Sequence, residues 1–311
     1  MRIIFMGTPD FAVGTLQALC DAGHEVVLAV TQPDKPAGRG KSLKAPPVKE
    51  LAEELGIPVF QPEKIRDPEA LDTLKTQNAD IIVVVAFGQI LPKAVLEMTR
   101  YGCVNVHASL LPAWRGAAPI QWSLLAGDEV TGVTTMQMDE GLDTGDILLQ
   151  REIPVEPDET GGSLFDKLAG AGAQLCVETL KELEAGTVSP VPQGETTTPY
   201  AKMLDKKMGR IDWSRPAGEI ERMIRGLSPW PGAYTYRGDK MLKVRKAGIT
   251  EAATVDSVPG TMRQAPDGSL LVQTGDAVMW IEEIQPAGKR AMTSAEYLRG
   301  KPVKPDDCTL G

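Results

Sequence analysis

The chain has 311 residues, of which 42% are hydrophobic and 24% are charged, and its formal net charge is −9. This balance is typical of a globular protein and excludes a disordered or fibrous chain. A chain of this length predicts one large or two ordinary domains. The longest apolar run, at 81–87, is too short to cross a bilayer, so we expect no membrane association.

Short β-rich runs alternate with helical patterns through the first half of the chain. The strands that this pattern predicts lie at 2–6, 26–31, 81–87, 103–107, 133–138 and 147–155. The helices that it predicts lie near 11–19, 48–55, 117–126 and 160–185. The apolar run at 81–87 is typical of a central parallel strand buried on both faces. The alternation predicts a doubly wound, Rossmann-like α/β domain.

The composition changes after the last of these helices. Residues 189–201 are rich in proline, threonine and glycine and interrupt the pattern. Beyond them the sequence predicts a helix near 216–226 and two hairpins, 234–244 and 270–284, each with a Gly-Asp turn. The organisation that we expect is an α/β domain over 1–188, a linker over 189–207 and a small OB-like β-barrel over 208–311.

The four cysteines are scattered, without a CxxC pair or histidines at metal-ligand spacing. This arrangement favours free thiols in a reducing compartment and disfavours a disulfide framework or a structural zinc site. The first residues, MRIIFMG, enter a predicted strand at once and leave no room for a signal peptide, so we expect a cytoplasmic protein. The cysteines are Cys20, Cys103, Cys176 and Cys308.

Charge is unevenly distributed along the chain. Residues 208–311 hold 15 lysines and arginines against 13 aspartates and glutamates, so the acidic excess lies in 1–207. Local basic surfaces are therefore compatible with the acidic total. Such surfaces could neutralise nucleic-acid phosphates, or could be ordinary solvated surface. The candidates are a glycine-rich loop with Lys35, Arg39, Lys41 and Lys44, and a second group with Lys202, Lys206, Lys207 and Arg210.

One of only two histidines lies in the stretch NVHASLLP, at the end of a predicted strand. Asn105 and His107 are two residues apart, so their side chains leave the same face, near the sheet edge where α/β proteins bind ligands. If the strand at 133–138 is a neighbour, a carboxylate from the loop DEGLDTGD at 139–146 could reach His107. An amide, an imidazole and a carboxylate together suit attack on a carbonyl, with the first two donating hydrogen bonds to the oxyanion.

The same residues also have a purely structural interpretation. His107 could be an ordinary buried histidine and Asn105 could cap a turn, and the pattern does not select Asp143 over Asp139 or Asp146. Other chemistries are disfavoured. There is no nucleophile elbow and no phosphate-binding GxxxxGK loop, and the turn GTPDFA departs from the dinucleotide-binding GxGxxG.

The stretch NVHASLLPAWRGAAPIQWSLLAGD, followed by TGVTTMQMDEGLDTGDIL, resembles the signature of the folate-dependent formyltransferases. Further stretches narrow the resemblance: RIIFMGTPDFA at the start, TQPDKPAGRGKSLKAPPVK at 31–49, and GRIDWS and LSPWPGAY in the second half. Together they are similar to the methionyl-tRNA formyltransferase family along nearly the whole chain.

The resemblance implies transfer of a formyl group from 10-formyltetrahydrofolate to the free amino group of methionine on initiator methionyl-tRNA. It implies direct attack by the amine and collapse of a tetrahedral intermediate, without a metal. The catalytic residues that it implies are Asn105, His107 and Asp143, and the folate-contacting loop is Ser109, Leu110, Leu111 and Pro112.

The resemblance also places the basic loop against the end of the tRNA, with Arg39 matching the family's key arginine. We expect the protein to act as a monomer. The tRNA contacts that we expect are Lys35, Arg39, Lys41 and Lys44 in the loop, and Lys206 and Lys207 in the linker.

Two other kinds of function remain open. An enzyme that formylates a nucleotide sugar, or that hydrolyses formyltetrahydrofolate, would share Asn105, His107 and Asp143 but would not need the basic loop. A nucleic-acid-binding protein with an inactive α/β domain would need the basic surfaces alone. The variant His107→Ala separates the tRNA enzyme from the nucleic-acid-binding protein, because loss of turnover with retained tRNA binding would support the enzyme.

Overall fold

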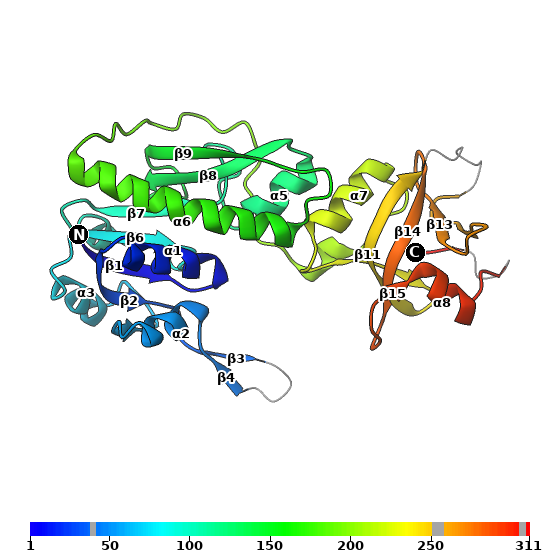
Figure 1. Cartoon of the computed structure of the whole chain (residues 1–311), viewed down its shortest axis with the longest axis horizontal. Coiled ribbons are helices and arrows are strands. Elements are labelled where there is room, and N and C mark those ends of the chain that lie inside the picture. Colours follow the sequence, from blue (N-terminus) through cyan, green and yellow to red (C-terminus); the bar gives the residue numbers. More distant parts are fainter. Residues whose placement is uncertain (38–41, 251–257, 305–308) are drawn as a thin grey trace. The chain divides into compact units, whose positions relative to one another are not determined.

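The structure is a computed structural model that describes residues 1–37, 42–250, 258–304 and 309–311 (Figure 1). The chain divides into two compact units. The first contains Met1–Pro119, Val130–Pro154 and Phe165–Ala201, and the second contains Ile120–Glu129, Val155–Leu164 and Lys202–Gly311. Two segments of the predicted α/β domain (1–188) therefore belong to the second unit.

A seven-stranded sheet forms the first unit, in the strand order β5-β2-β1-β6-β7-β8-β9. The strands from β5 to β7 in this order are parallel, whereas β8 and β9 run antiparallel to their neighbours. The prediction of a Rossmann-like α/β domain is confirmed, with an antiparallel edge added to a parallel sheet. The strands are β1 (Arg2–Gly7), β2 (Glu25–Val30), β5 (Val59–Phe60), β6 (Ile81–Val85), β7 (Cys103–His107), β8 (Val130–Gln137) and β9 (Ile147–Pro154).

Two helices, α1 (Asp10–Asp21) and α6 (Gly161–Ala185), lie on one face of this sheet. Helix α6 approaches β7 so closely that a Cβ added at Gly172 would lie 2.8 Å from Cγ1 of Val106. The rings of Phe11 on α1 and Phe165 on α6 meet edge to face, with their centroids 5.3 Å apart. These contacts place both helices on the face to which Val106 points.

A buried apolar cluster joins the opposite face to two short helices, α3 (Pro68–Lys75) and α4 (Lys93–Leu96). Leu74 and Val95 from these helices pack with Ile4 of β1 and Ile82 of β6. Strand β6 is buried along its whole length because both of its faces are covered, which confirms the predicted central strand. Helix α2 (Pro47–Glu54), which begins with a proline, packs against α1.

The basic loop contains a short hairpin. Strand β3 (Lys35–Ala37) pairs antiparallel with β4 (Ser42–Lys44) in a two-stranded sheet of its own. Figure 1 shows these two strands, which together form an arm (35–37 and 42–44), projecting from the α/β sheet of the first unit. The sequence predicts only a glycine-rich loop here, because three-residue strands carry too little alternation to be recognised.

An antiparallel sheet of six strands forms the second unit, in the order β10-β11-β14-β13-β12, with β15 paired to β14. The two predicted hairpins, β10–β11 and β13–β14, are confirmed. The strands are β10 (Ala233–Arg237), β11 (Lys240–Thr250), β12 (Met262–Gln264), β13 (Leu270–Gln273), β14 (Val278–Pro286) and β15 (Met292–Thr293). The helices are α5 (Pro119–Ala126), α7 (Ala217–Gly226), α8 (Ser294–Gly300) and a 3₁₀ turn, Lys206–Gly209.

The last residues of the chain close this sheet. Gly311 exchanges two backbone hydrogen bonds with Tyr236 of β10, at 2.9 and 3.0 Å. The amide of Leu310 donates to the carbonyl of Gly260, just before β12, at 2.8 Å. The C-terminal residues thus bridge the two edge strands, β10 and β12, as in a small barrel, in agreement with the predicted fold. Among the residues described, no helix is long and apolar enough to cross a membrane.

Candidate active site

Strand β7 carries two polar side chains into the interior of the first unit. Asn105 and His107 are only 8% and 6% exposed. Strand residues alternate between faces, so these two point away from Val106 and therefore away from α6. β7 lies between β6 and β8, so the condition on which a carboxylate from the loop at 139–146 could reach His107 is met.

The carboxamide of Asn105 is available to a ligand. It has no hydrogen-bond partner within the described part of the chain. In that same part, every side-chain nitrogen or oxygen that is fully buried has a partner. The carboxamide of Asn105 must therefore reach solvent, with its N–H donors free at the surface of a largely buried site.

His107 lies between two hydrogen-bond acceptors. Its Nε2 is 3.1 Å from the carbonyl oxygen of Trp114. A carbonyl can only accept, so Nε2 carries the proton and donates in this bond. Nδ1 faces Oδ1 of Asp143 at 3.9 Å, which is too long for a hydrogen bond but close enough for an electrostatic interaction. Nδ1 is thus the ring nitrogen that remains available to other groups.

Asp143 reaches His107 by an unexpected route. Because β8 is antiparallel to β7, its carboxyl end lies beside Val104, and the amide of Met138 donates to the carbonyl of Cys103 at 2.8 Å. The loop from 138 to 146 then returns along β7 to bring Asp143 to His107. Oδ2 of Asp143 also accepts a hydrogen bond from the amide of Gly116, at 3.0 Å.

The structure distinguishes the three aspartates of this loop. The carboxylate of Asp139 accepts hydrogen bonds from the amide of Gly141, at 3.0 Å, and from the hydroxyl of Thr144, at 2.8 Å. It therefore stabilises its own turn. Asp146 starts the return to β9, and its carbonyl accepts from the amide of Gln137 at 2.8 Å. Of the three, Asp143 is the one that lies against His107, a selection that the sequence pattern does not make.

The turn from Ser109 to Pro112 is held from inside by the hydroxyl of Thr134. This hydroxyl donates to the carbonyl of Ser109 at 2.7 Å and accepts from the amide of Leu111 at 3.1 Å. The hydroxyl of Ser109 donates to the carbonyl of Ala113 at 2.6 Å, so it is committed within the turn. Ser109 and Leu111 are buried, whereas Leu110 and Pro112 are partly exposed. The turn therefore offers an apolar outer surface next to His107.

Family profiles match most of the chain. The profile described as formyl transferase matches residues 1–180, and that described as formyl transferase, C-terminal domain, matches residues 203–302. The methionyl-tRNA formyltransferase of Agathobacter rectalis is 55% identical over 300 residues, which cover 96% of each chain. That of Lachnospira eligens is 52% identical over 308 residues, which cover 98% of each chain.

The chain belongs to the methionyl-tRNA formyltransferase family. Solved structures of proteins with low sequence identity to this chain share its fold. HypX from Aquifex aeolicus, solved in complex with tetrahydrofolic acid, superposes with a TM-score of 0.65 at 19% identity, and the match covers 98% of this chain and 48% of HypX. The sequence resemblance to the family is thus confirmed by comparison over nearly the full length.

In this formyltransferase the arm presents two of its predicted cations side by side. Lys35 and Lys44 are exposed and lie directly opposite one another on β3 and β4. Like charges in such a pair repel, which favours an anion between them. The other two predicted cations, Arg39 and Lys41, lie outside the described residues.

The acid nearest to the arm is engaged elsewhere. Asp34 accepts hydrogen bonds from Nζ of Lys49, at 2.9 and 3.0 Å, and from Nε2 of Gln61, at 2.9 Å. The hydrogen bond from Gln61, and to a smaller extent the hydrogen bond from Lys49, lower the pKa of the Asp34 carboxyl. The carboxylate therefore remains charged and paired with Lys49 at the base of the arm.

The second unit carries the other predicted cations. Lys206 and Lys207 are exposed in the 3₁₀ turn, and the carboxylate of Asp205 caps this turn by accepting from the amide of Lys207 at 2.6 Å. Within the same unit, a pocket of about 390 Å³ is lined on one side by apolar residues that include Met208.

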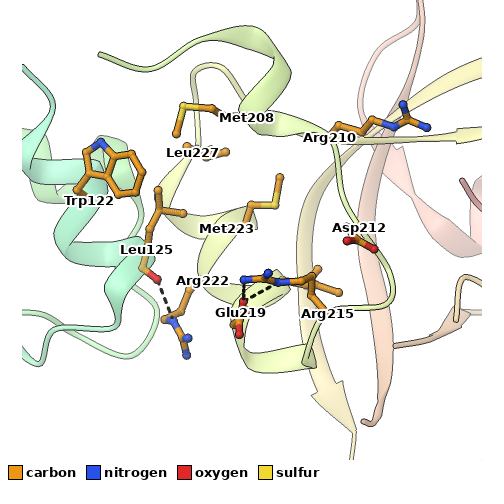
Figure 2. A pocket seen from close by; sticks show the side chains of 11 residues that line it. Trp122, Leu125, Met208, Arg210, Asp212, Arg215, Glu219, Arg222, Met223 and Leu227 are labelled. Carbon is orange, nitrogen blue, oxygen red and sulfur yellow. Dashed lines mark hydrogen bonds and ion pairs between the residues drawn. The ribbon is translucent and has the colours of Figure 1, made fainter. Parts of the chain in front are cut away.

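Three arginines line the polar side of this pocket: Arg210, Arg215 and Arg222 (Figure 2). Arg215 forms an ion pair with Glu219, and Nε of Arg222 donates to the carbonyl of Leu125 at 3.3 Å. Arg210 belongs to a basic group that the sequence predicts, whereas Arg215 and Arg222 do not. Their charges are interspersed with acids on α7 and just before it, so they form no basic run that could have been recognised.

The described cysteines are all unpaired. Cys103 and Cys176 are buried, and burial raises the pKa of each thiol to about 12, while Cys20 is half-buried. Cys308 lies outside the described residues.

No group of three or more histidine, cysteine, aspartate or glutamate side chains suited to a metal occurs in the part of the chain that the structure describes.

Proposed function

We propose that this chain transfers the formyl group of 10-formyltetrahydrofolate to the amino group of methionine on initiator methionyl-tRNA. The observation that carries the proposal is the identity of 55% and 52% to two methionyl-tRNA formyltransferases over nearly the whole of each chain. The site adds a chemical reason: a free amide and an imidazole next to a carboxylate suit attack on a carbonyl.

The roles that we assign to the site follow from its free groups. The co-substrate supplies a formyl carbon bonded to nitrogen. Asn105 donates an N–H to the formyl oxygen as negative charge develops there. His107, whose Nε2 is fixed by Trp114, uses Nδ1 to exchange protons with the reacting groups, and Asp143 stabilises the charged imidazole. A bond forms from the methionine nitrogen to the formyl carbon, the bond from the donor nitrogen breaks, and the proton lost by the amine passes to that leaving nitrogen.

The folate is held, in this proposal, by the turn from Ser109 to Pro112. Leu110 and Pro112 are the partly exposed members and would contact the folate, while Ser109 and Leu111 support the turn from beneath. This division of roles follows from the buried hydrogen bonds of Ser109 and Thr134. An apolar turn beside the reacting groups would also exclude water from the formyl carbon.

The tRNA is contacted by the two basic regions. Lys35 and Lys44 would bind a phosphate between them, and Arg39 and Lys41, which lie between them in the sequence, would add further tRNA contacts. Lys206 and Lys207 would contact the backbone further along the tRNA. Both pairs are exposed, as a surface for a polyanion requires. The enzyme would act as a monomer in the cytoplasm, where its free thiols remain reduced, and would need no metal.

The assignment is tested by offering three acceptors with 10-formyltetrahydrofolate: initiator methionyl-tRNA, elongator methionyl-tRNA and a nucleotide-linked amino sugar. We expect transfer to the initiator tRNA to exceed transfer to either of the others by at least about 100-fold in kcat/KM. Faster transfer to the amino sugar would preserve the roles of Asn105 and His107 but would contradict the proposed acceptor.

A further inference from the structure

The segment that follows α6 runs along the candidate active site. This strap (residues 191–201) begins at a β-bridge between Val191 and Ile147. It ends at Ala201, whose amide donates to the carbonyl of Arg115 at 2.8 Å. The sequence predicts a linker here, but both ends of the strap are attached to the first unit. Within 191–200, only Gln193 and Thr198 are not exposed.

Gln193 ties two loops of the site together. Its Nε2 donates to the carbonyl of Asp143 at 3.0 Å and to the carbonyl of Gly145 at 2.6 Å. Its Oε1 accepts from Nε of Arg115 at 3.0 Å. The loop that carries Asp143 is thereby fixed to the segment that carries Trp114.

Thr198 makes the corresponding contact on the other side of His107. Its Oγ1 accepts a hydrogen bond from the amide of Trp114 at 2.7 Å. The carbonyl of the same residue accepts from Nε2 of His107. The strap therefore reaches both groups that face the imidazole, Trp114 through Thr198 and Asp143 through Gln193.

Asp143 and Trp114 both have an unfavourable backbone conformation. Asp143 and Trp114 each have φ of 56°, in the left-handed region that residues with a side chain rarely adopt. Such conformations persist where neighbouring groups over-determine them, and they cluster at functional sites. Here each strained residue is held by one of the two strap side chains that are not exposed.

We propose that Gln193 and Thr198 are positioning residues that hold Asp143 and Trp114 against His107. The strap then sets the orientation of the imidazole and the place of the carboxylate beside it. This proposal rests on the proposed role of His107 and Asp143 in formyl transfer. The strap side chains themselves touch no reacting atom.

The first test observes the imidazole directly and needs no substrate. The chain has only two histidines, so ¹⁵N-histidine labelling gives two sets of ring signals, which a His24→Gln variant assigns. We expect Gln193→Leu and Thr198→Val to move the His107 signals while leaving those of His24 in place. Glu195→Leu and Thr197→Val alter exposed strap residues and should move neither set.

The second test measures single-turnover formyl transfer to initiator methionyl-tRNA. We expect Gln193→Leu and Thr198→Val to lower the rate by about tenfold or more, with the Kd for either substrate changed by less than about threefold. Thr198→Ser keeps the accepting oxygen and should restore most of the rate. In an Asp143→Asn background, Gln193→Leu should cost less than about twofold further, because its effect acts through Asp143.

Unmoved His107 signals, an unchanged rate, or a full additional loss in the Asp143→Asn background would each overturn the positioning role. A slow Asp143→Asn enzyme together with a normal Gln193→Leu enzyme would overturn this proposal alone. A normal rate for Asp143→Asn would instead show that the proposed catalytic role of Asp143 is wrong. Thermal unfolding of each variant separates these outcomes from loss of the fold.

Discussion

His107 illustrates how far a single sequence can define a site. Asn105 and His107 could be placed on one face from their spacing, because side chains alternate in every strand. Asp143 could not be chosen from spacing, since Asp139 and Asp146 lie in the same loop. Its selection depends on the antiparallel direction of β8 and on the return of the loop along β7. Both are properties of contacts between distant segments.

Two buried thiols should make the stability of the folded protein depend on pH in the alkaline range. Burial raises the pKa of Cys103 and Cys176 from 9.0 to about 12, so the folded protein keeps both thiols protonated where the unfolded chain ionises them. Their contribution to stability is present below pH 9 and is lost as pH rises toward 12. We expect each thiol to lower the free energy of unfolding by about 1.4 kcal/mol per pH unit in this range.

Urea unfolding of the parent and of Cys176→Ala, compared between pH 8 and pH 11, checks this prediction. The variant should start less stable because of the small cavity, and should lose stability less steeply above pH 9. Parallel declines for the two proteins would show that the thiol ionises equally in the folded and unfolded states.

At the scale of elements, the regular pattern was predictable and the short pieces were not. The strands β1, β6 and β7 and the helices α6 and α7 follow from hydrophobic periodicity, which is local. The arm was predicted only as a basic loop. Its pairing places Lys35 opposite Lys44, a repulsive arrangement that a bound phosphate would relieve.

Neutralising this lysine pair should weaken tRNA binding in a salt-dependent manner. For Lys35→Met with Lys44→Met, we expect the Kd for tRNA to rise by about tenfold at low salt, and the slope of log K against log salt to fall in magnitude by about 1.5. Lys75→Met, at an exposed lysine on α3, is the matched control and should change neither value. An unchanged salt slope in the double variant would remove the arm from the tRNA interface.

At the scale of the whole molecule, the chain passes repeatedly between its two folded units. The fold class of each unit was predictable, because strand and helix alternation gives way to hairpins near residue 200. The assignment of Ile120–Glu129 to the second unit was not, nor was the closure of the second sheet by Leu310. Each depends on long-range contacts that leave no periodic signal. The strap was likewise predicted as a linker, although it contacts the residues that face His107.

The proposed catalytic centre is tested by the single-turnover rate of formyl transfer to initiator methionyl-tRNA in His107→Ala. We predict a fall of about 1,000-fold, with the Kd for tRNA changed by less than about threefold, since the imidazole acts on the reacting groups. His24→Ala, which removes the other histidine, should keep the parent rate within about twofold. A His107→Ala rate within about tenfold of the parent would contradict the proposed catalytic centre.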